Sequence, residues 1–575
     1  MSRLSKLLPA SDWLSDYNSS TFSADLIAAI VVTVMLIPQS LAYAMLAGVP
    51  PEMGLYASIL PLIAYALFGT SRTLSVGPVA IVSLMTASAV GKLIEPGSAE
   101  YLSATIALAF ISGGMLLAMG LLRFGMLANL LSHPVVVGFI TASSLIIALS
   151  QMKYILGISA HGENAFALTT SLLQNIPATN PYTLGVGVFA LGFLIWARRW
   201  LRPLLQTCGI SDENAGRMAK AGPVLAIIMT TVAAWFFDLG DHAVALVGNI
   251  PRGLPSIGLP KFDAEQWREL AGAALLISII GYVESVSVGK TLAAKRRQRI
   301  DANQELIALG SANIASALSG GIPVTGGFSR SVVNFEAGAV TQMASILTAI
   351  GIAIAALVLT PYLAFLPKAT LAAAIIVAIS ALIDFSFIPR AWRYSKSDFI
   401  AITTTISVTL LFGIELGLIC GVSASIALHL YKTSQPHIAI VGEVPGTEHF
   451  RNINRHQVKT CPRIVSMRID ESLYFANASF VEDRLYAILA DNPELEHIVL
   501  MCTAINEIDL SALAVLESVN ERMQEAGVQL HLSEVKGPVM DCLEKTEFIK
   551  KLSGNVYLSQ HLAITDLDSD GDHLK

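Results

Sequence analysis

Long apolar runs separated by short polar segments fill the first three quarters of this chain, and shorter runs alternate in the last quarter. Stretches such as 26–37, 101–122, 135–149 and 399–412 predict a helical membrane domain over 25–436. Hydropathy together with Gly and Pro punctuation predicts about fourteen spans. They cover 25–45, 54–69, 79–91, 102–122, 133–150, 182–199, 219–237, 271–290, 305–318, 329–340, 342–360, 369–384, 397–413 and 415–431.

Two of these spans are short and begin at breaks rich in Gly and Pro. The first break is Ser75–Ala80, and the second is Gly320–Arg330. Neither span has the roughly 20 residues that a helix needs to cross a bilayer. They are spans three and ten. These two spans are seven spans apart. Because seven is an odd number, the second copy enters the membrane from the opposite side, which is typical of the inverted repeats of carriers.

Each break creates a helix N-terminus with unpaired N–H groups and a positive dipole end. Two such ends aimed at one point would bind an anion. The pattern therefore favours an anion transporter, and the alternative is two unrelated breaks in another kind of helical bundle.

Composition agrees with a membrane protein, since only 14% of the residues are charged and 54% are hydrophobic. If the N-terminus is cytoplasmic, the loops on that side contain fifteen Lys and Arg residues, against six on the other side. This positive-inside bias predicts cytoplasmic N- and C-termini in the plasma (inner) membrane. The segment 1–24 is polar and lacks the pattern of a signal peptide.

Several function classes lack support in the sequence. Residues 437–575 carry 12 basic and 22 acidic residues, which argues against binding to nucleic acid. The five cysteines form no CxxC pair and indicate no metal site. No nucleophile–base pair or nucleotide loop is visible, so we expect neither an enzyme nor a cofactor.

Two charged residues inside predicted spans are candidates for function, because charges are costly there. Arg330 follows the second break and can add its charge to the helix dipole, or it can stabilise the core instead. Glu284 is the only carboxylate in span eight. A carboxylate in apolar surroundings can bind and release a proton near neutral pH. The alternative for Glu284 is an ion pair with Lys290 or contact with water.

The motifs resemble those of the SulP family of anion permeases. Leu36–Ala44 with Ala47–Pro51 is similar to the family's first-span signature, and Gly69–Pro78 and Gly326–Ser331 resemble the starts of spans three and ten. The resemblance implies a core of spans one to four and eight to eleven, which moves against a gate, and a homodimer. It also implies an anion site lined by these residues: Gln39, Tyr43, Ser75, Gly77, Val79, Ala80, Thr325, Gly326, Gly327, Phe328, Ser329 and Arg330.

The chain after His437 predicts a small α/β domain. We expect strands at 438–443, 463–469, 497–502 and 528–532 and helices at 480–490, 511–526 and 538–545. This domain, 437–560, resembles the STAS domain, which implies possible cytoplasmic partners. Ser511 matches the serine that is phosphorylated in related antagonists, although helix capping by Asp509 explains the motif as well. Residues 561–575 are acidic and predict a disordered tail.

Together these features predict a proton-coupled secondary transporter that imports a small inorganic anion, most simply sulfate, by alternating access. A bicarbonate or four-carbon dicarboxylate transporter of the same fold is the first alternative. An uncoupled exchanger or channel and a membrane sensor are the others. A span-eight Glu resembles the proton-coupled type in this family.

Overall fold

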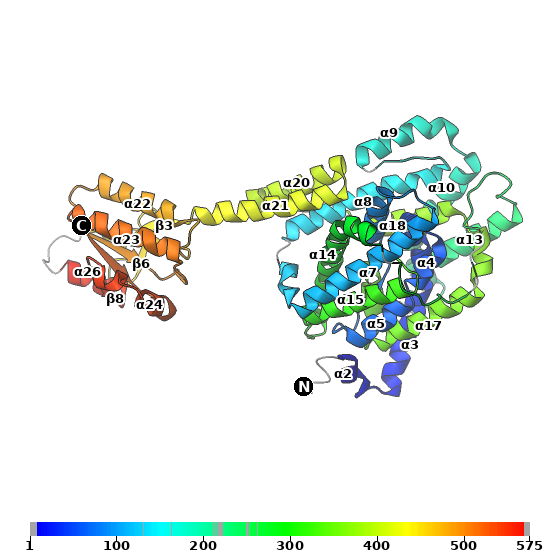
Figure 1. The fold of residues 1–575 in the computed structure, drawn as a ribbon, viewed down its shortest axis with the longest axis horizontal. Helices are drawn as coiled ribbons and strands as arrows, with labels where there is room; N and C mark the ends of the chain where they lie inside the picture. The colour runs from blue at the N-terminus through cyan, green and yellow to red at the C-terminus, as the bar shows by residue number, and fades with distance from the viewer. Residues whose placement is uncertain are drawn as a thin grey trace. The chain divides into compact units, whose positions relative to one another are not determined.

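The computed structural model describes residues 8–129, 132–162, 164–209, 211–212, 215–216, 222–248, 251, 253–261 and 263–568. The chain divides into two compact units, a helical one over 1–424 and an α/β one over 425–575 (Figure 1). Each unit is considered by itself below. Residues 1–7 of the predicted N-terminal segment and 569–575 of the predicted tail lie outside the described residues.

The first half of the helical unit contains the first seven predicted spans. A short helix, α2 (Ala10–Leu14), precedes them, and the following helices are α3 (Ser19–Leu46), α4 (Pro51–Tyr56), α5 (Leu60–Phe68), α6 (Ala80–Gly91), α7 (Ala99–Leu121), α8 (His133–Leu156), α9 (Ala165–Asn175), α10 (Pro181–Trp196), α11 (Arg202–Thr207) and α13 (Gly222–Phe236). Strand β1 (Val76–Gly77) lies directly before α6.

The second half repeats this order. Its helices are α14 (Ala264–Lys295), α15 (Ala302–Leu318), α16 (Phe328–Glu336), α17 (Met343–Val358), α18 (Lys368–Ser380), α19 (Phe387–Tyr394), α20 (Lys396–Phe412) and α21 (Ile414–Ser434), and strand β2 (Thr325–Gly326) precedes α16. Shorter single turns lie at Phe124–Asn129, Ile176–Ala178, Ala197–Leu201 and Thr360–Phe365.

Every predicted span has a helical counterpart in the structure. Among the described residues, seven helices are long and apolar enough to cross a membrane, and four apolar helices are shorter. The helices of spans three and ten have 12 and 9 residues, so the prediction of two short spans is confirmed. The structure differs from the expectation in span two, which breaks into α4 and α5, and in the unpredicted helices α9 and α19.

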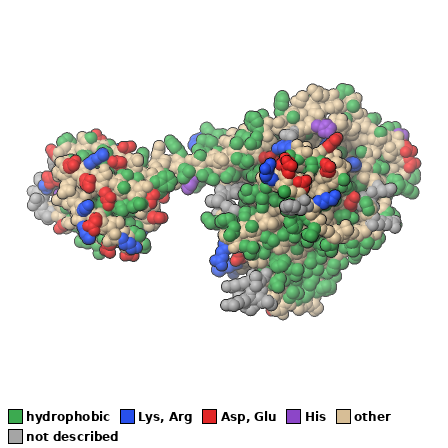
Figure 2. All heavy atoms as spheres, viewed as in Figure 1, with side chains coloured by type: hydrophobic (Ala, Val, Ile, Leu, Met, Phe, Trp, Pro, Cys, Tyr) green, Lys and Arg blue, Asp and Glu red, His purple; other side chains and the backbone are tan. Residues whose placement is uncertain are grey.

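The helices pack into two groups. In the core group, α15 packs against α7 and α5, α17 against α3, and α14 against α7. In the gate group, α8 packs against α20, α18 and α10. The groups meet where α3 contacts α18 and α13 and where α6 contacts α8. At the surface of this unit in Figure 2, hydrophobic side chains cover wide areas and charges gather in a few places, as a lipid-facing surface requires.

Glycines permit close helix packing in the hairpin of α20 and α21. A Cβ on Gly417 would overlap Thr409, and one on Gly421 would overlap the Thr405 hydroxyl. Gly417 and Gly421 therefore serve helix packing, as small residues in membrane helices commonly do, whereas Gly413 ends α20 with a φ of 96°.

The α/β unit is built on one mixed sheet of six strands. They are β3 (Ile438–Glu443), β4 (Phe450–Asn452), β5 (Ile464–Ile469), β6 (His497–Met501), β7 (Gln529–Ser533) and β8 (Val556–Tyr557), in the order β4-β3-β5-β6-β7-β8. Strands β5 to β8 are parallel, and β3 pairs antiparallel with β4 and β5. The helices are α22 (Ala478–Asp491), α23 (Leu510–Glu525), α24 (Gly537–Leu543), α25 (Phe548–Lys551) and α26 (Gln560–Leu567).

The four predicted strands and three predicted helices of this domain are present, and β4, β8, α25 and α26 were not predicted. Helix α26 lies in the range 561–575, so the expectation of disorder is wrong as far as Leu567. The reason is burial, because Ala563 and Ile564 pack into a core beside Val499.

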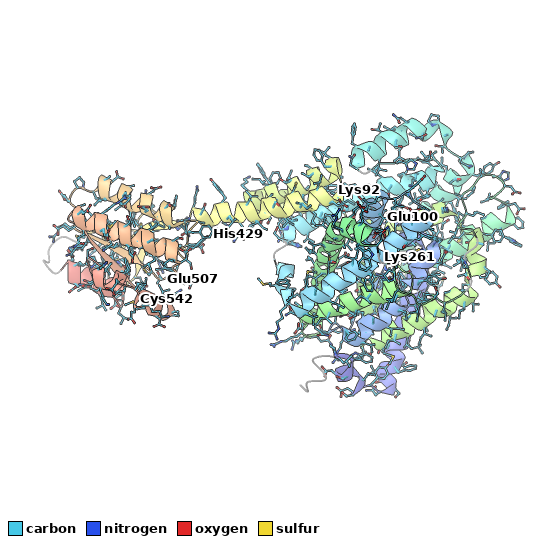
Figure 3. The ribbon with its side chains drawn as sticks, viewed as in Figure 1. Lys92, Glu100, Lys261, His429, Glu507 and Cys542 are labelled. Carbon is cyan, nitrogen blue, oxygen red and sulfur yellow. The ribbon has the colours of Figure 1, made fainter. Side chains whose placement is uncertain are left out.

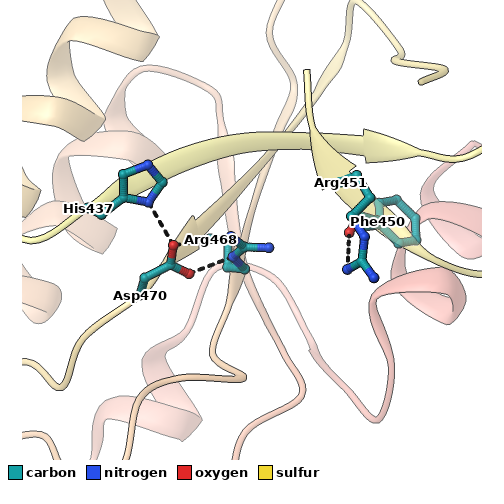
Figure 4. Close-up of polar contacts among 5 residues, drawn as sticks. All are labelled: His437, Phe450, Arg451, Arg468 and Asp470. Atoms are coloured by element: carbon teal, nitrogen blue, oxygen red, sulfur yellow. Dashed lines mark hydrogen bonds and ion pairs between the residues drawn. The ribbon is translucent and has the colours of Figure 1, made fainter. Parts of the chain in front are cut away.

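A polar cluster joins the ends of β3 and β5 (Figure 4). The Asp470 carboxylate accepts hydrogen bonds from the Arg468 guanidinium at 2.6 Å and pairs with the His437 ring at 2.7 Å. Burial acts to raise the pKa of Asp470, but the bonds from Arg468 and His437 outweigh it and lower the pKa. This cluster therefore keeps the Asp470 carboxylate charged at the end of β5.

Candidate functional site

The two sequence breaks meet in the structure. Strands β1 and β2 pair antiparallel, with Val76 opposite Gly326 and Gly77 opposite Thr325. The Gly327 N–H donates to the Ser75 carbonyl at 3.3 Å. The Ser75 N–H in turn donates to the Ser331 hydroxyl at 3.0 Å. Residues about 250 positions apart in the sequence thus form one small crossover that orients both short helices.

Both short helices start at this crossover without a side-chain cap. The residues before the first turns are Val79 for α6 and Gly327 for α16, and neither provides a capping side chain. The first N–H groups of a helix have no partner within the helix and carry the positive end of its dipole. The crossover therefore gathers two partly positive helix ends, as the sequence predicted.

Arg330 brings a full positive charge to the same place. It lies in the first turn of α16 and is only 2% exposed. Its Nη1 donates to the Pro78 carbonyl at 2.8 Å. Its Nε and Nη2 are buried and have no hydrogen-bond partner among the described residues. A buried guanidinium with unused donors is costly, so these donors favour an anion that would accept from them.

Two glycines make room for this guanidinium. A Cβ on Gly77 would lie 3.0 Å from Arg330 Nη1. A Cβ on Gly327 would lie 3.1 Å from Arg330 Nη2 and equally close to Val79. Only a residue without a side chain fits at these two positions without moving the charge. The predicted glycines thus have a steric reason in the geometry around Arg330.

Helix α14, which is the eighth predicted span, binds the crossover. The Thr325 hydroxyl donates to the Gly281 carbonyl at 2.6 Å, and the Gly326 N–H donates to the Ser285 hydroxyl at 2.8 Å. The Thr325 hydroxyl is therefore engaged in holding β2 against α14. Sequence reasoning placed Thr325 in the site but did not identify Ser285 as its partner.

Glu284 lies on this same helix, next to Ser285. Its Oε2 is buried without a hydrogen-bond partner among the described residues. Glu284, Arg330 and Tyr43 are close enough to interact electrostatically. The structure describes both Glu284 and Lys290 and shows no ion pair between them. Tyr43 is 8% exposed, so this group of polar residues is largely shielded.

A cavity of about 420 Å³ lies beside the crossover, between the core and gate groups. From the core it is lined by three of the predicted residues, Gln39, Phe328 and Ser329. From the gate it is lined by residues such as Arg198 and Ala378. A small anion could reach the start of α16 through this space, because Ser329 is exposed in the cavity.

The predicted residues thus occupy two connected places. Gln39, Phe328 and Ser329 line the cavity, and the others form or surround the buried crossover: Tyr43, Ser75, Gly77, Val79, Ala80, Thr325, Gly326, Gly327 and Arg330. Pro38 lies within α3 directly before Gln39 and also lines the cavity.

Two buried carboxylates hold the crossover, and sequence reasoning missed both. Glu305 on α15 accepts from the Tyr65 hydroxyl at 2.6 Å, from Thr70 N–H at 2.8 Å and from Ser71 N–H at 3.1 Å. It therefore fixes the segment that leads into β1. Its position at the first residue of a predicted span was the available signal.

Asp25 on α3 has the corresponding role in the other repeat. It accepts from Val340 N–H at 2.7 Å and from the Thr341 hydroxyl at 2.5 Å, behind the end of α16. Each carboxylate thus binds the backbone of the opposite repeat. These hydrogen-bonded buried carboxylates therefore tie the two repeats of the core group together.

Ser511 lies in the α/β unit, which does not contain this site. It is exposed in the first turn of α23, and Asp509 caps that helix by accepting from Ala512 N–H at 2.8 Å. The second Asp509 oxygen accepts from Phe475 N–H at 2.8 Å. The predicted cap is confirmed, and phosphorylation of Ser511 stays a prediction.

Comparison with known proteins follows the same division of the chain. Residues 22–405 match the profile of the sulfate permease family, and residues 455–563 match that of the STAS domain. The chain is 36% identical over 559 residues to "Probable sulfate transporter 4.2" of Arabidopsis thaliana, covering 95% of this chain and 81% of that protein. It is also 36% identical over 542 residues to "Sulfate transporter 4.1, chloroplastic" of the same plant, covering 92% and 77%.

Solved structures share the fold. The murine Solute Carrier 26 family member A9 anion transporter in the inward-facing state has a TM-score of 0.87 at 24% identity, covering 98% of this chain and 94% of that one. The transmembrane domain of the cyanobacterial bicarbonate transporter BicA has a TM-score of 0.60 at 20% identity, covering 70% and 98%. These likenesses support a helical domain of seven plus seven inverted spans with a C-terminal STAS domain.

Proposed function

The chain belongs to the sulfate permease family of anion transporters, and on that premise we propose that it imports sulfate together with protons by alternating access. The observation that carries the anion site is the buried guanidinium of Arg330, which lies between two uncapped helix ends and has two donors without a partner in the described residues. The names of the plant relatives favour sulfate.

The proposed anion site combines the crossover and the cavity. Sulfate would accept from Arg330 Nε and Nη2 and from N–H groups at the starts of α6 and α16, with Gln39 and Ser329 on the cavity side. A compact tetrahedral anion suits donors that converge from several directions. Bicarbonate and four-carbon dicarboxylates are the substrates that the experiment below must distinguish from sulfate.

Glu284 is proposed as the proton carrier. Import of a dianion against a negative-inside potential costs about 2.3 kcal/mol per charge at 100 mV, so protons carried along would lower the opposing work. The buried, unpartnered Oε2 of Glu284 can accept a proton without breaking an existing hydrogen bond. Its electrostatic interaction with Arg330 provides a link between proton and anion binding.

The test is uptake of labelled sulfate into proteoliposomes with an acidic exterior and a neutral interior. We expect uptake that needs the pH gradient, and we expect Glu284→Gln to abolish that dependence. The matched control is Glu269→Gln, an exposed carboxylate on the same helix α14, which should behave as wild type. Gradient-independent flux that Glu284→Gln leaves unchanged would refute proton coupling and favour an exchanger or channel.

The substrate is tested separately from the coupling. Sulfate should bind to the purified protein, and Arg330→Gln should weaken that binding more than Arg330→Lys. If bicarbonate or succinate binds and sulfate does not, the proposal of sulfate as the substrate fails, and the proposal of an anion site is retained.

Alternating access predicts movement between core and gate. Lys92 at the end of α6 and Glu415 at the start of α21 form an ion pair at 2.8 Å that joins the two groups (Lys92 is labelled in Figure 3). With the five native cysteines replaced, Lys92→Cys with Glu415→Cys should stop transport when a short bis-maleimide links the pair. Full transport by the cross-linked protein would exclude relative movement at this point.

The remaining features of the proposal follow the family. We propose a homodimer in the plasma (inner) membrane with both termini in the cytoplasm and with cytoplasmic partners for the STAS domain. Analytical ultracentrifugation in detergent and protease protection in sealed vesicles test the first two statements.

A further inference from the structure

Helix α19 combines exposed cations with exposed aromatic rings. Its residues Arg390 and Arg393 are exposed, as is Lys396 at the start of α20. Trp392 is 52% exposed and Tyr394 is 90% exposed. The anion site above uses none of these residues, and the sequence pattern had indicated only basic loops in this region.

The opposite side of α19 holds it against the gate group. Ala391 is buried, and the Phe387 ring meets His133 of α8 with ring centroids 5.3 Å apart. The Trp392 ring meets Phe399 of α20 edge-on at 4.7 Å. The helix is thus held against α8 and α20, while Arg390, Arg393 and Lys396 stay exposed.

The position of α19 in the chain places it at a bilayer surface. It connects α18, which ends at Ser380, with α20, which begins at Lys396, and both are membrane helices of the gate group. A short helix in such a turn lies near the headgroups. Trp, Tyr and basic residues are typical of that zone, where rings are partly dry and charges meet phosphates.

The charges on this surface lack a carboxylate partner in the part of the protein that the structure describes. None of the three cations forms an ion pair with a carboxylate among the described residues. Lys396 instead stands over the Trp392 ring, 3.0 Å from its centroid. The nearby Asp384 is engaged with the Ser386 hydroxyl and N–H. The surface therefore complements a partner of negative charge at membrane depth.

We propose that α19 and the start of α20 bind the headgroups of anionic phospholipids, with Arg390, Arg393 and Lys396 facing the phosphates and Trp392 and Tyr394 seated among the headgroups. Neutral phospholipids can surround the aromatic rings, but their headgroups carry no net negative charge that would balance the three cations. Because α19 joins two gate helices, bound lipid would hold that hairpin at the membrane surface. This proposal is independent of which anion is transported.

The test uses the full chain in proteoliposomes and the fluorescence of Trp392. Brominated phosphatidylglycerol and brominated phosphatidylcholine are compared as quenchers, and Trp392→Phe identifies the part of the signal that belongs to this ring. We expect stronger quenching by the anionic lipid at low salt. Each basic residue near an anionic surface contributes roughly fivefold to binding, the ratio that corresponds to about 1 kcal/mol. Added salt should reduce the preference.

The deciding variant replaces Arg390, Arg393 and Lys396 by Gln and should remove the preference for the anionic lipid. The matched control makes the same change of charge at Lys545, Lys550 and Lys551 in the α/β unit, which are exposed, and should retain it. Exchanging Arg390 and Arg393 for Lys should also retain it. Equal quenching of wild type by both lipids, or a preference that survives the triple Gln variant, would overturn the proposal. If the triple variant does not fold, the salt dependence of the wild type and the three single variants decide.

Discussion

A pair of histidines in the STAS domain, the buried His531 and the partly exposed His497, predicts a specific pH dependence of stability. His531 on β7 is 1% exposed, and its Nδ1 accepts a hydrogen bond from Asn555 N–H at 2.9 Å. The ring proton of neutral His531 is therefore on Nε2, which donates to His497 Nδ1 on β6 at 3.2 Å. A second proton would break the bond to Asn555, the residue directly before β8, and leave that N–H without its acceptor.

The size of the effect follows from the pKa of His531. Burial first, and then the neighbouring His497, lower that pKa from 6.5 to about 4. The unfolded chain binds the proton below pH 6.5, and the folded domain binds it only near pH 4. The stabilising contribution is thus fully present at neutral pH and is lost as the pH falls from 6.5 to 4. At 1.36 kcal/mol for each pH unit, the loss amounts to about 3 kcal/mol.

The assay is urea unfolding of the C-terminal domain, residues 437–568, at neutral pH and near pH 4. This fragment contains its own buried core, which includes Leu485, Leu500 and Val519. His531→Gln is the reference, because it cannot titrate while its amide can still accept from Asn555 N–H. Wild type should lose about 3 kcal/mol more than the variant on acidification. A parallel loss of stability in both proteins would refute the reasoning.

Three further predictions concern the crossover and its supports. Gly77→Ala should weaken sulfate binding about tenfold, because the added Cβ would lie 3.0 Å from Arg330 Nη1. Isothermal titration measures the affinity, and an unchanged affinity would contradict this prediction. Glu305→Gln should destabilise the membrane domain by about 3 kcal/mol, because an amide has a single acceptor oxygen and no negative charge, whereas the carboxylate accepts from the Tyr65 hydroxyl with one oxygen and from Thr70 and Ser71 with the other. A thermal-shift assay with Glu269→Gln as control measures the effect, and an equal shift in both variants would disprove it. Asp509→Ala should lower the free energy of unfolding of the STAS domain by about 1 kcal/mol, because it removes the cap of α23, whereas Asp509→Asn should retain most of that stability. Urea unfolding compares the two variants, and equal losses of stability would argue against capping.

Local pattern predicted most of the architecture. Hydropathy and Gly/Pro breaks located the spans, including the short α6 and α16, because a bilayer demands long apolar runs and makes their interruption conspicuous. The alternation after His437 located the main strands and helices of the α/β domain. The helix α26 was missed because it is short and lies in an acidic segment, and its order depends on packing of Ala563 and Ile564 beside Val499 of the sheet.

The candidate site was predicted in its residues but not in its contacts. Arg330 stood out as a charge in an apolar span, yet no pattern showed that Gly77 and Gly327 would enclose its guanidinium. Glu305 and Asp25 looked like the polar ends of spans. Their partners are hundreds of residues away, so no local pattern could assign them to the support of the crossover.

The sequence by itself determined which segments enter the membrane, which two are broken and that Arg330 and Glu284 lie within apolar spans, since these depend on composition and spacing along the chain. Only the tertiary structure decided that the two breaks pair as β1 and β2 and that, in the part of the chain the structure describes, two donors of Arg330 and one oxygen of Glu284 have no hydrogen-bond partner. Such properties depend on distances between residues of opposite repeats, and those distances exist only after the two halves have packed together.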